Sequence, residues 1–345
     1  MSLIKEIVNN LPYLLIYYVP GFCTIFAYRR FRSARSFAMS ETVHLGACVV
    51  ISYIINLFLE VVGRRADGYH LIDGVMQSVE LGDNVRVTVE PGGEGISLRV
   101  TGDDSVPTDS TNLAWRAAER FLGKTGLRAG VKIELEKRIP AAGGLAGGSS
   151  DAACVLRLLN SLAGENALPR DVLREPAAGL GADVTFCLES PDGAMRTEGI
   201  GEILTPVPAL PDCAILLANA GDGVSTPWAY GLLDELKREY ITERREQGRR
   251  VQRMLEALGS GDLGAVCAAC RNAFEEVIPP VRPQVRALRK RMWRAGAATA
   301  MMSGSGPSVF GLFADRAAAE KLCGELRSEG VKAFVTRPRR NDAES

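Results

Sequence analysis

The sequence predicts an α+β fold with two domains. Segments in which apolar and polar residues alternate, the pattern of a half-buried strand, occur at 84–90, 96–100 and 131–139. Segments with apolar residues at helical spacing lie beside them, at 111–126 and 149–162. With 345 residues, 46% of them apolar, the chain can bury a large core, and its length suggests two domains.

The second half of the chain predicts a separate layer. Apolar runs at 214–220 and 308–313 are typical of buried strands, and a helical pattern at 316–330 precedes a strand at 332–337. A strand-helix-strand unit with an earlier strand predicts a ferredoxin-like C-terminal layer. The predicted boundaries give one domain at 51–205, a second at 206–337 and a disordered tail at 338–345.

Composition excludes several classes of function. The 41 basic and 41 acidic residues balance, so net charge does not point to a nucleic-acid partner. The two histidines, His44 and His70, nearly exclude a histidine-based metal site or a Ser-His-Asp triad.

The first fifty residues differ from the rest of the chain. Residues 11–28 contain no charged residue, and eighteen helical residues would span about 27 Å, close to the core of a bilayer. The arginines that follow predict a cytoplasmic location for that end: Arg29, Arg30, Arg32 and Arg35. We interpret residues 1–50 as an atypical extension with a candidate membrane segment at 11–28. A helix or hairpin packed on the folded domains is the alternative.

A second apolar run, at 45–62, is also long enough to span a membrane. Its second half leads into the turn-rich sequence GRRADGYH. We therefore expect a buried strand at about 55–63.

The most informative motif is PAAGGLAGGSSDAA, at 140–153. Its four glycines lie between the strand predicted at 131–139 and the helix predicted at 149–162. Glycines let the backbone approach an anion closely, and the N–H groups of a first helical turn point at it. We expect a phosphate-binding loop; a flexible loop before an alanine-rich helix is the alternative. The loop residues are Pro140, Ala141, Ala142, Gly143, Gly144, Leu145, Ala146, Gly147, Gly148, Ser149 and Ser150.

This motif is neither a P-loop, which ends in Gly-Lys-Ser/Thr, nor a G-x-G-x-x-G dinucleotide turn. It resembles the second motif of the GHMP kinases, the superfamily of galactokinase, homoserine kinase and mevalonate kinase. MMSGSGPSVFGLF (301–313) is similar to the third motif of the superfamily. INLFLEVVGRRADGYH (55–70) is similar to the first motif of one branch, whose substrate is methylerythritol linked to cytidine diphosphate. Four more segments resemble that branch in order: GLGADVTFCLE (179–189), GIGEILTP (199–206), GVSTPWAY (223–230) and RNAFEEV (271–277).

The resemblance runs from about Ile55 to about Thr336 and implies both fold and chemistry. The fold would be that of a GHMP kinase, with a glycine-rich ATP loop in an N-terminal α+β domain and a ferredoxin-like C-terminal domain. ATP with Mg²⁺ would phosphorylate the 2-hydroxyl of the substrate in the cytoplasm, a step of the non-mevalonate route to isoprenoids. The resemblance does not identify the magnesium ligands or the oligomeric state.

Asp183 matches the aspartate base of the family. Phosphoryl transfer to an alcohol needs a carboxylate within hydrogen-bond reach of the attacking hydroxyl. Because Asp183 follows glycines and precedes the apolar VTFCL, we place it on a strand edge that faces the loop. A structural cap is the alternative, since Gly-Ala-Asp is also turn chemistry.

The substrate base is expected between aromatic side chains. The resemblance assigns Tyr69 and His70 to one side of the cytosine ring and Tyr230 to the other, with Asn56 as a polar contact. Each stacked plane contributes about 1–3 kcal/mol. On pattern alone, a hairpin tip would explain the first pair and a core aromatic would explain Tyr230. Further candidates to line the cleft are Lys137, Arg138, Ser303, Gly304, Ser305 and Gly306.

One position departs from the family pattern. The branch carries Pro-Ala-Lys directly before Ile55, where this chain has Ser52, Tyr53 and Ile54. The lysine is thought to assist deprotonation of the hydroxyl or to steady the transferring phosphoryl group. Losing one such preorganised group costs about 10²–10³ in rate, so we expect weakened turnover. The alternatives are another GHMP kinase, of the homoserine or mevalonate type, and a membrane-tethered, inactive ligand-binding homologue.

Overall fold

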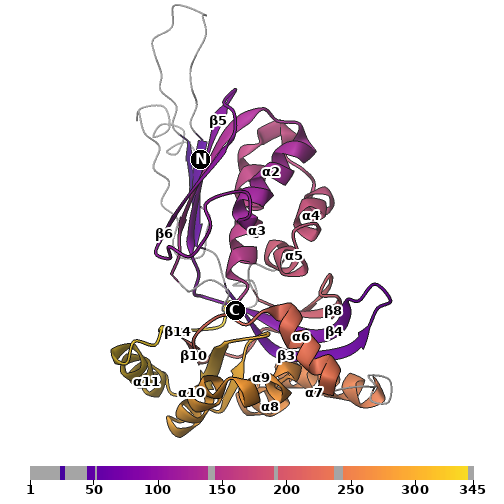
Figure 1. Cartoon of the computed structure of the whole chain (residues 1–345), viewed down its shortest axis with the longest axis vertical. Coiled ribbons are helices and arrows are strands. Elements are labelled where there is room, and N and C mark those ends of the chain that lie inside the picture. Colours follow the sequence, from indigo (N-terminus) through magenta and orange to yellow (C-terminus); the bar gives the residue numbers. More distant parts are fainter. Residues whose placement is uncertain are drawn as a thin grey trace, which may run out of the picture.

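The computed structural model describes residues 24–27, 45–50, 53–138, 144–189, 193–236 and 244–340. They form two halves, stacked vertically in Figure 1. The upper half contains a five-stranded sheet in the order β1-β2-β5-β7-β6. Its strands are β1 (Thr24–Ala27), β2 (Leu45–Val50), β5 (Asn84–Pro91), β7 (Ala129–Glu136) and β6 (Ile96–Thr101). Four helices lie on one side of this sheet (Figure 1). Helices α2 (Leu113–Thr125) and α3 (Gly147–Leu162) pack on the strands, and α4 (Arg170–Ala178) and α5 (Ala182–Glu189) pack against those two helices.

The alternation predicted for these strands produces the core of the upper half. Val85 and Val87 of β5 and Ile133 of β7 are fully buried and belong to one apolar cluster with the helices. Helix α2 begins where the Asn112 side chain accepts a hydrogen bond from the backbone N–H of Ala114. The helices predicted at 111–126 and 149–162 are therefore confirmed, with α3 beginning two residues early.

The lower half contains two sheets. The first has the order β11-β3-β4-β8-β9 and the second the order β12-β13-β10-β14. The first consists of β3 (Tyr53–Arg64), β4 (His70–Val79), β8 (Ala194–Gly199), β9 (Ile203–Val207) and β11 (Arg271–Asn272). The second consists of β10 (Ala214–Asn219), β12 (Thr299–Met302), β13 (Ser308–Phe313) and β14 (Ala333–Thr336). The helices of this half are α6 (Thr226–Leu236), α7 (Arg244–Ser260), α8 (Leu263–Ala269), α9 (Ile278–Val281), α10 (Pro283–Arg294) and α11 (Arg316–Ser328).

The antiparallel sheet β12-β13-β10-β14 confirms the predicted ferredoxin-like layer. Helices α10 and α11 cover it, and Leu288 and Leu326 from these helices share an apolar cluster with Leu216 and Phe313 of the strands. The spatial halves differ from the predicted domains at 51–205 and 206–337, however. Strands β3, β4, β8 and β9 come from the first sequence range but pack against the C-terminal layer, because Leu57 and Phe310 belong to one core.

The first fifty residues are not wholly a foreign extension. Strand β2 pairs antiparallel with β5 from Leu45↔Val89 to Val50↔Asn84, so residues 45–50 belong to the upper sheet. Residues 24–27 of the predicted membrane segment form strand β1, paired with β2, whereas residues 11–23 lie outside the described part of the chain. A short apolar run cannot by itself distinguish a membrane helix from a strand. Across the parts of the chain that the structure describes, none of the helices combines the length and apolar character needed to cross a membrane.

The predicted disorder of the tail is wrong for residues 338–340. The backbone N–H of Arg339 donates to the Ser78 carbonyl at 2.8 Å, and Pro338 pairs with Val79. The Gln77 side chain also donates to the Arg339 carbonyl at 2.8 Å. Residues 341–345 lie outside the described part.

Candidate active site

The described part of the glycine loop enters α3 through left-handed backbone. Gly144 has φ +72° and Ala146, the N-cap of α3, has φ +55°. No side chain caps this helix, so its first N–H groups are left for another acceptor. The structure thus places Gly144, Leu145, Ala146, Gly147, Gly148, Ser149 and Ser150 at a helix N-terminus, whereas Pro140, Ala141, Ala142 and Gly143 lie outside the described residues.

The two glycine-rich segments meet, although about 160 residues separate them. A Cβ atom on Gly144 would lie 2.5 Å from the Ser303 carbonyl oxygen and 3.1 Å from that of Gly306. Only glycine permits this approach. Asn56 joins the same junction, since its N–H donates to Ser303 Oγ at 3.2 Å and its Oδ1 accepts from that hydroxyl at 3.3 Å.

The sequence suggested that Lys137 approaches the nucleotide. In the structure its side chain instead bonds to two aspartates. Its ammonium is buried and bonded to Asp83 and, at 2.8 Å, to Asp151 Oδ2. Tyr53 donates to the same Asp83 carboxylate. Burial opposes the charge on Lys137, but Asp151 and Asp83 outweigh it and raise the lysine pKa. Burial also raises the pKa of Asp151 to about 7, against the opposing effect of Lys137.

This buried cluster ties the two ends of the glycine loop together. Lys137 lies just before the loop, and Asp151 lies near the N-terminus of the helix after it. Tyr53 lies directly under the helix start, because a Cβ on Gly147 would be 2.7 Å from the tyrosine ring. The sequence analysis missed Asp83 and Asp151; the Ser-Ser-Asp sequence at the start of α3 was the available signal.

Asp183 lies in the first turn of α5, not on a strand edge as predicted. The apolar residues that suggested a strand form a helix that is buried all round, including Val184, Phe186 and Leu188, and periodicity alone cannot separate the two. The Asp183 side chain is accessible to solvent. It nevertheless lies deep among protein atoms, and this loss of hydration raises the pKa of its carboxyl.

Asp183 and Tyr230 lie close enough to interact electrostatically. Burial, with a further contribution from the Asp183 charge, raises the pKa of Tyr230 to about 12. The structure therefore brings α5 of the upper half near α6 of the lower half.

His70 and Tyr230 stack directly on each other. Their ring centroids are 4.3 Å apart with planes 13° apart, and Phe274 packs edge-on against Tyr230 at 5.0 Å. A base held between His70 and Tyr230 would need roughly twice that separation. In this structure these two rings lie directly against each other, and the bracket around a base stays a prediction. Tyr69, with 60% of its surface exposed, is the aromatic residue of this group that is open to a ligand.

The position that lacks the family lysine is part of the core. Ile54 is 3% exposed and packs with the helices of the upper half. Burial is the cause of the raised Asp183 pKa, and no cationic side chain of the described residues acts against it. The structure thus offers no replacement for the missing lysine among the residues that it describes.

Within the described ranges, no cluster of three or more His, Cys, Asp or Glu side chains is arranged to hold a metal ion. Cys267 and Cys270 have Cys-x-x-Cys spacing but are free thiols, and burial raises the pKa of each. Mg²⁺ bound through nucleotide phosphates needs only one or two protein oxygens, and the hydroxyl of Ser149 near the α3 N-terminus fits that need. Ser150 is buried, and its hydroxyl contacts Cys187 Sγ at 3.3 Å.

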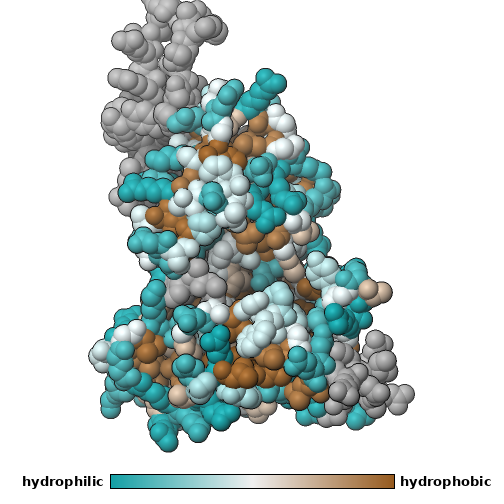
Figure 2. Space-filling model, in the orientation of Figure 1, coloured by the Kyte–Doolittle hydropathy of each residue, from teal (hydrophilic) through white to brown (hydrophobic). Residues whose placement is uncertain are grey.

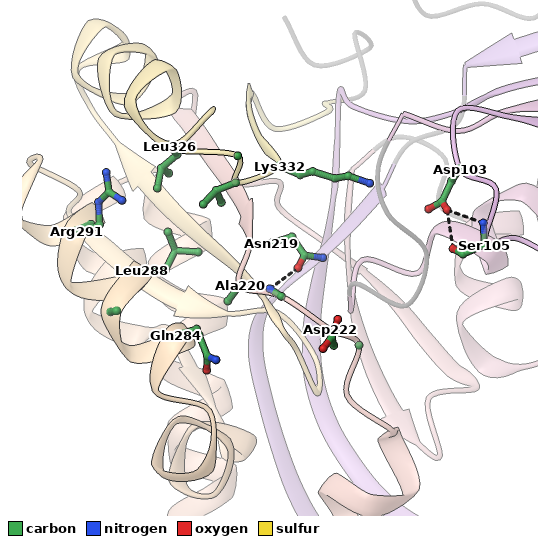
Figure 3. Close-up of a pocket in the computed structure, with 15 residues that line it drawn as sticks. Asp103, Ser105, Asn219, Ala220, Asp222, Gln284, Leu288, Arg291, Leu326 and Lys332 are labelled. Carbon is green, nitrogen blue, oxygen red and sulfur yellow. Dashed lines mark hydrogen bonds between the residues drawn. The ribbon is translucent and has the colours of Figure 1, made fainter. Parts of the chain in front are cut away.

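The structure also has a cavity of about 650 Å³ that is lined by none of the site residues described above. It is lined by residues 219–223, by α10 and by Lys332, with Asp103 and Ser105 from the upper half. Figure 3 shows Lys332 extending across the cavity toward Asp103. On the surface of the lower half, hydrophobic residues gather near α9 (Figure 2). The cavity contains none of the predicted site residues.

The fold, the facing glycine loops and the aspartate in the cleft define a kinase of the GHMP class. The family model described as "GHMP kinases N terminal domain" matches residues 112–190, and "GHMP kinases C terminal" matches residues 254–332. A homoserine kinase from Cytophaga hutchinsonii has a TM-score of 0.68 at 19% identity, covering 89% of this chain and 98% of that one, which shows the fold alone.

Sequence relatives narrow the class. The chain is 42% identical over 298 residues to the 4-diphosphocytidyl-2-C-methyl-D-erythritol kinase of Gloeobacter violaceus, covering 86% of this chain and 94% of the relative. The kinase of the same name from Geobacillus kaustophilus is 38% identical over 283 residues, covering 82% and 93%. A crystal structure of 4-(cytidine 5'-diphospho)-2C-methyl-D-erythritol kinase has a TM-score of 0.68 at 33% identity, covering 85% and 100%. The chain belongs to the 4-diphosphocytidyl-2-C-methyl-D-erythritol kinase family of the GHMP kinases.

Proposed function

We propose that this kinase transfers the γ-phosphoryl group of ATP to the 2-hydroxyl of 4-diphosphocytidyl-2-C-methyl-D-erythritol. The reaction belongs to the non-mevalonate route to isoprenoid precursors, and we place it in the cytoplasm. The observation that carries the proposal is that separate segments meet: the α3 N-terminus contacts the 303–306 loop, Asp183 lies near Tyr230, and Tyr230 stacks on His70. The relatives of the same name support the choice of substrate.

In the proposed mechanism the protein contributes position and a base. The N-terminus of α3 and the left-handed backbone at Gly144 hold the phosphates of ATP through N–H groups. Magnesium supplied with ATP neutralises phosphate charge. Asp183 takes the proton of the 2-hydroxyl as its oxygen attacks the γ-phosphorus, and ADP leaves. A raised pKa makes this carboxylate a stronger base than an ordinary aspartate.

Ile54 weakens this arrangement without removing it. An isoleucine supplies no charge to the transferring phosphoryl group, and the lost group is worth about 10²–10³ in rate. Ile54 itself is buried among the apolar side chains of the core. The proposal is therefore a kinase with a slow chemical step and normal ligand binding.

The test is an assay that couples ADP release to an absorbance change, with 4-diphosphocytidyl-2-C-methyl-D-erythritol, mevalonate and homoserine as parallel acceptors. We expect turnover with the cytidine substrate alone. Turnover with mevalonate or homoserine instead would overturn the assignment of the substrate.

A second candidate, a binding protein with no turnover, is favoured by Ile54 alone. Calorimetry would separate it from the kinase. Binding of both ligands without ADP release would support the binding protein, whereas release of ADP at any rate that the Asp183→Asn variant abolishes would exclude it.

A further inference from the structure

The end of the β3–β4 hairpin and helix α6 are joined by one carboxylate. Asp234 of α6 accepts from His70 Nε2 at 2.8 Å through Oδ1 and pairs with Arg64 Nη1 at 3.1 Å through Oδ2. Arg64 and His70 are cross-strand partners at the last register position of β3 and β4. Arg64 also donates from Nε to the Gly68 carbonyl at 3.2 Å. A single side chain thus holds both strands and, through Arg64, the turn that leads to Tyr69.

Two residues of α6 hold the same imidazole. Tyr230 and Asp234 are four residues apart, so they lie on one face of the helix. Tyr230 contacts the flat face of the His70 ring at 4.3 Å, and Asp234 contacts its edge. Phe274, which is 2% exposed, packs edge-on against Tyr230 and limits its movement. The position and orientation of His70 are therefore set from two directions.

The hydrogen bond also sets the chemistry of the ring. A carboxylate can only accept, so the proton of the bond lies on Nε2 of His70. The side chain of His70 is 8% exposed and that of Asp234 is 26% exposed. This bond is thus more shielded from water than a surface ion pair, and such bonds contribute more than exposed ones.

We propose that Asp234 is a positioning residue of the pyrimidine-binding site. It clamps the hairpin that carries Tyr69 and His70 to the helix that carries Tyr230, so that the elements expected to bind the cytosine base keep a fixed geometry. The proposal rests on the proposed function, because it assumes that these aromatic residues bind the base of a cytidine diphosphate group. Asp234 lies beyond the 223–230 motif, and its role follows from the contacts alone.

The test compares Asp234→Ala with Glu235→Ala. Glu235 is the exposed neighbour on the same helix, so its variant removes the same charge without touching His70. Calorimetry with cytidine 5'-diphosphate measures the base site apart from catalysis, and an ATP analogue measures the nucleotide site. We expect Asp234→Ala to bind cytidine diphosphate roughly 10- to 100-fold more weakly, the range for a lost hydrogen bond to a charged group. Binding of the ATP analogue and both affinities of Glu235→Ala should be unchanged.

Kinetics give a second readout that a general loss of structure would not reproduce. Because the base is remote from the reacting hydroxyl, Asp234→Ala should raise KM for the cytidine substrate and leave kcat within about threefold. Asp234→Asn keeps a carbonyl oxygen that can accept from His70, but it replaces the charged oxygen that pairs with Arg64 by an uncharged NH₂ group. The affinity of this variant for cytidine diphosphate should therefore lie between those of wild type and Asp234→Ala. If alanine unfolds the chain, this variant carries the test.

The outcomes separate this proposal from the one on which it rests. Wild-type affinity for cytidine diphosphate in both Asp234 variants, in a wild-type enzyme that turns over the cytidine substrate, would overturn the role of Asp234 alone. Failure of the wild-type protein to bind cytidine diphosphate or to turn over the substrate would overturn both proposals.

Discussion

Replacing Asp183 by asparagine tests the proposed mechanism most directly. The substitution keeps the shape of the side chain and removes its capacity to accept the hydroxyl proton. A positioned general base contributes about 10²–10⁴ in rate, so kcat should fall by that factor while KM for both substrates changes little. The protein should fold normally, because burial disfavours the aspartate charge and asparagine removes that cost.

The raised pKa of Asp183 predicts how kcat and stability change with pH. Burial raises the pKa of Asp183, and the ionised form is the base, so kcat should rise with pH through a limb above the ordinary aspartate range of about 3.9. The same shift means that the folded state favours the protonated form, so the native carboxylate lowers stability as pH rises through its raised pKa. The asparagine variant should therefore be at least as stable as wild type at pH 8.

The assay is ADP release from pH 5 to pH 9, with urea unfolding of both proteins at pH 8. The variant should lose the acid limb together with the rate. A variant that keeps more than a tenth of wild-type kcat, or keeps the limb, would show that Asp183 is not the base and refute the argument from its position in α5.

Three further predictions follow from the loop and its supports. Ile54→Lys should raise kcat by up to about 10²–10³ and lower the unfolding free energy, because the side chain replaced is 3% exposed; unchanged turnover in the ADP-release assay of a folded variant would remove the explanation of slow chemistry. Lys137→Met leaves two buried carboxylates without their cation and should cost about 3–5 kcal/mol in urea unfolding at pH 7. The deficit should shrink toward pH 5 as Asp151, whose pKa burial raises to about 7, takes up a proton, and a constant deficit would contradict the ion-pair account. Gly144→Ala, which places a Cβ 2.5 Å from the Ser303 carbonyl oxygen at φ +72°, should weaken binding of an ATP analogue in calorimetry; unchanged affinity would show that the two loops move apart freely.

Much of the site depended on contacts that no local pattern records. The sequence placed Asp183 in the cleft by resemblance but assigned it to a strand, because a helix buried all round has the same apolar run as a strand. The sequence placed Lys137 near the loop. It could not show that Asp83 and Asp151 form ion pairs with that lysine. The stack of His70 on Tyr230 joins residues 160 positions apart.

The sequence by itself determined the features that short-range physics controls. Alternation predicted β5 and β7, helical spacing predicted α2 and α3, and the glycines of the 140–153 motif predicted a loop that enters a helix, since each depends on residues within one turn or one strand. Only the tertiary structure decided how those elements share cores. The sheet containing β3 and β4 joined the C-terminal layer rather than the domain predicted from sequence, and β1, from the end of the predicted membrane segment, paired with β2 in the upper sheet. Asp234 became the link between hairpin and helix for the same reason: partners distant in sequence are chosen by the burial and hydrogen bonding of the whole fold.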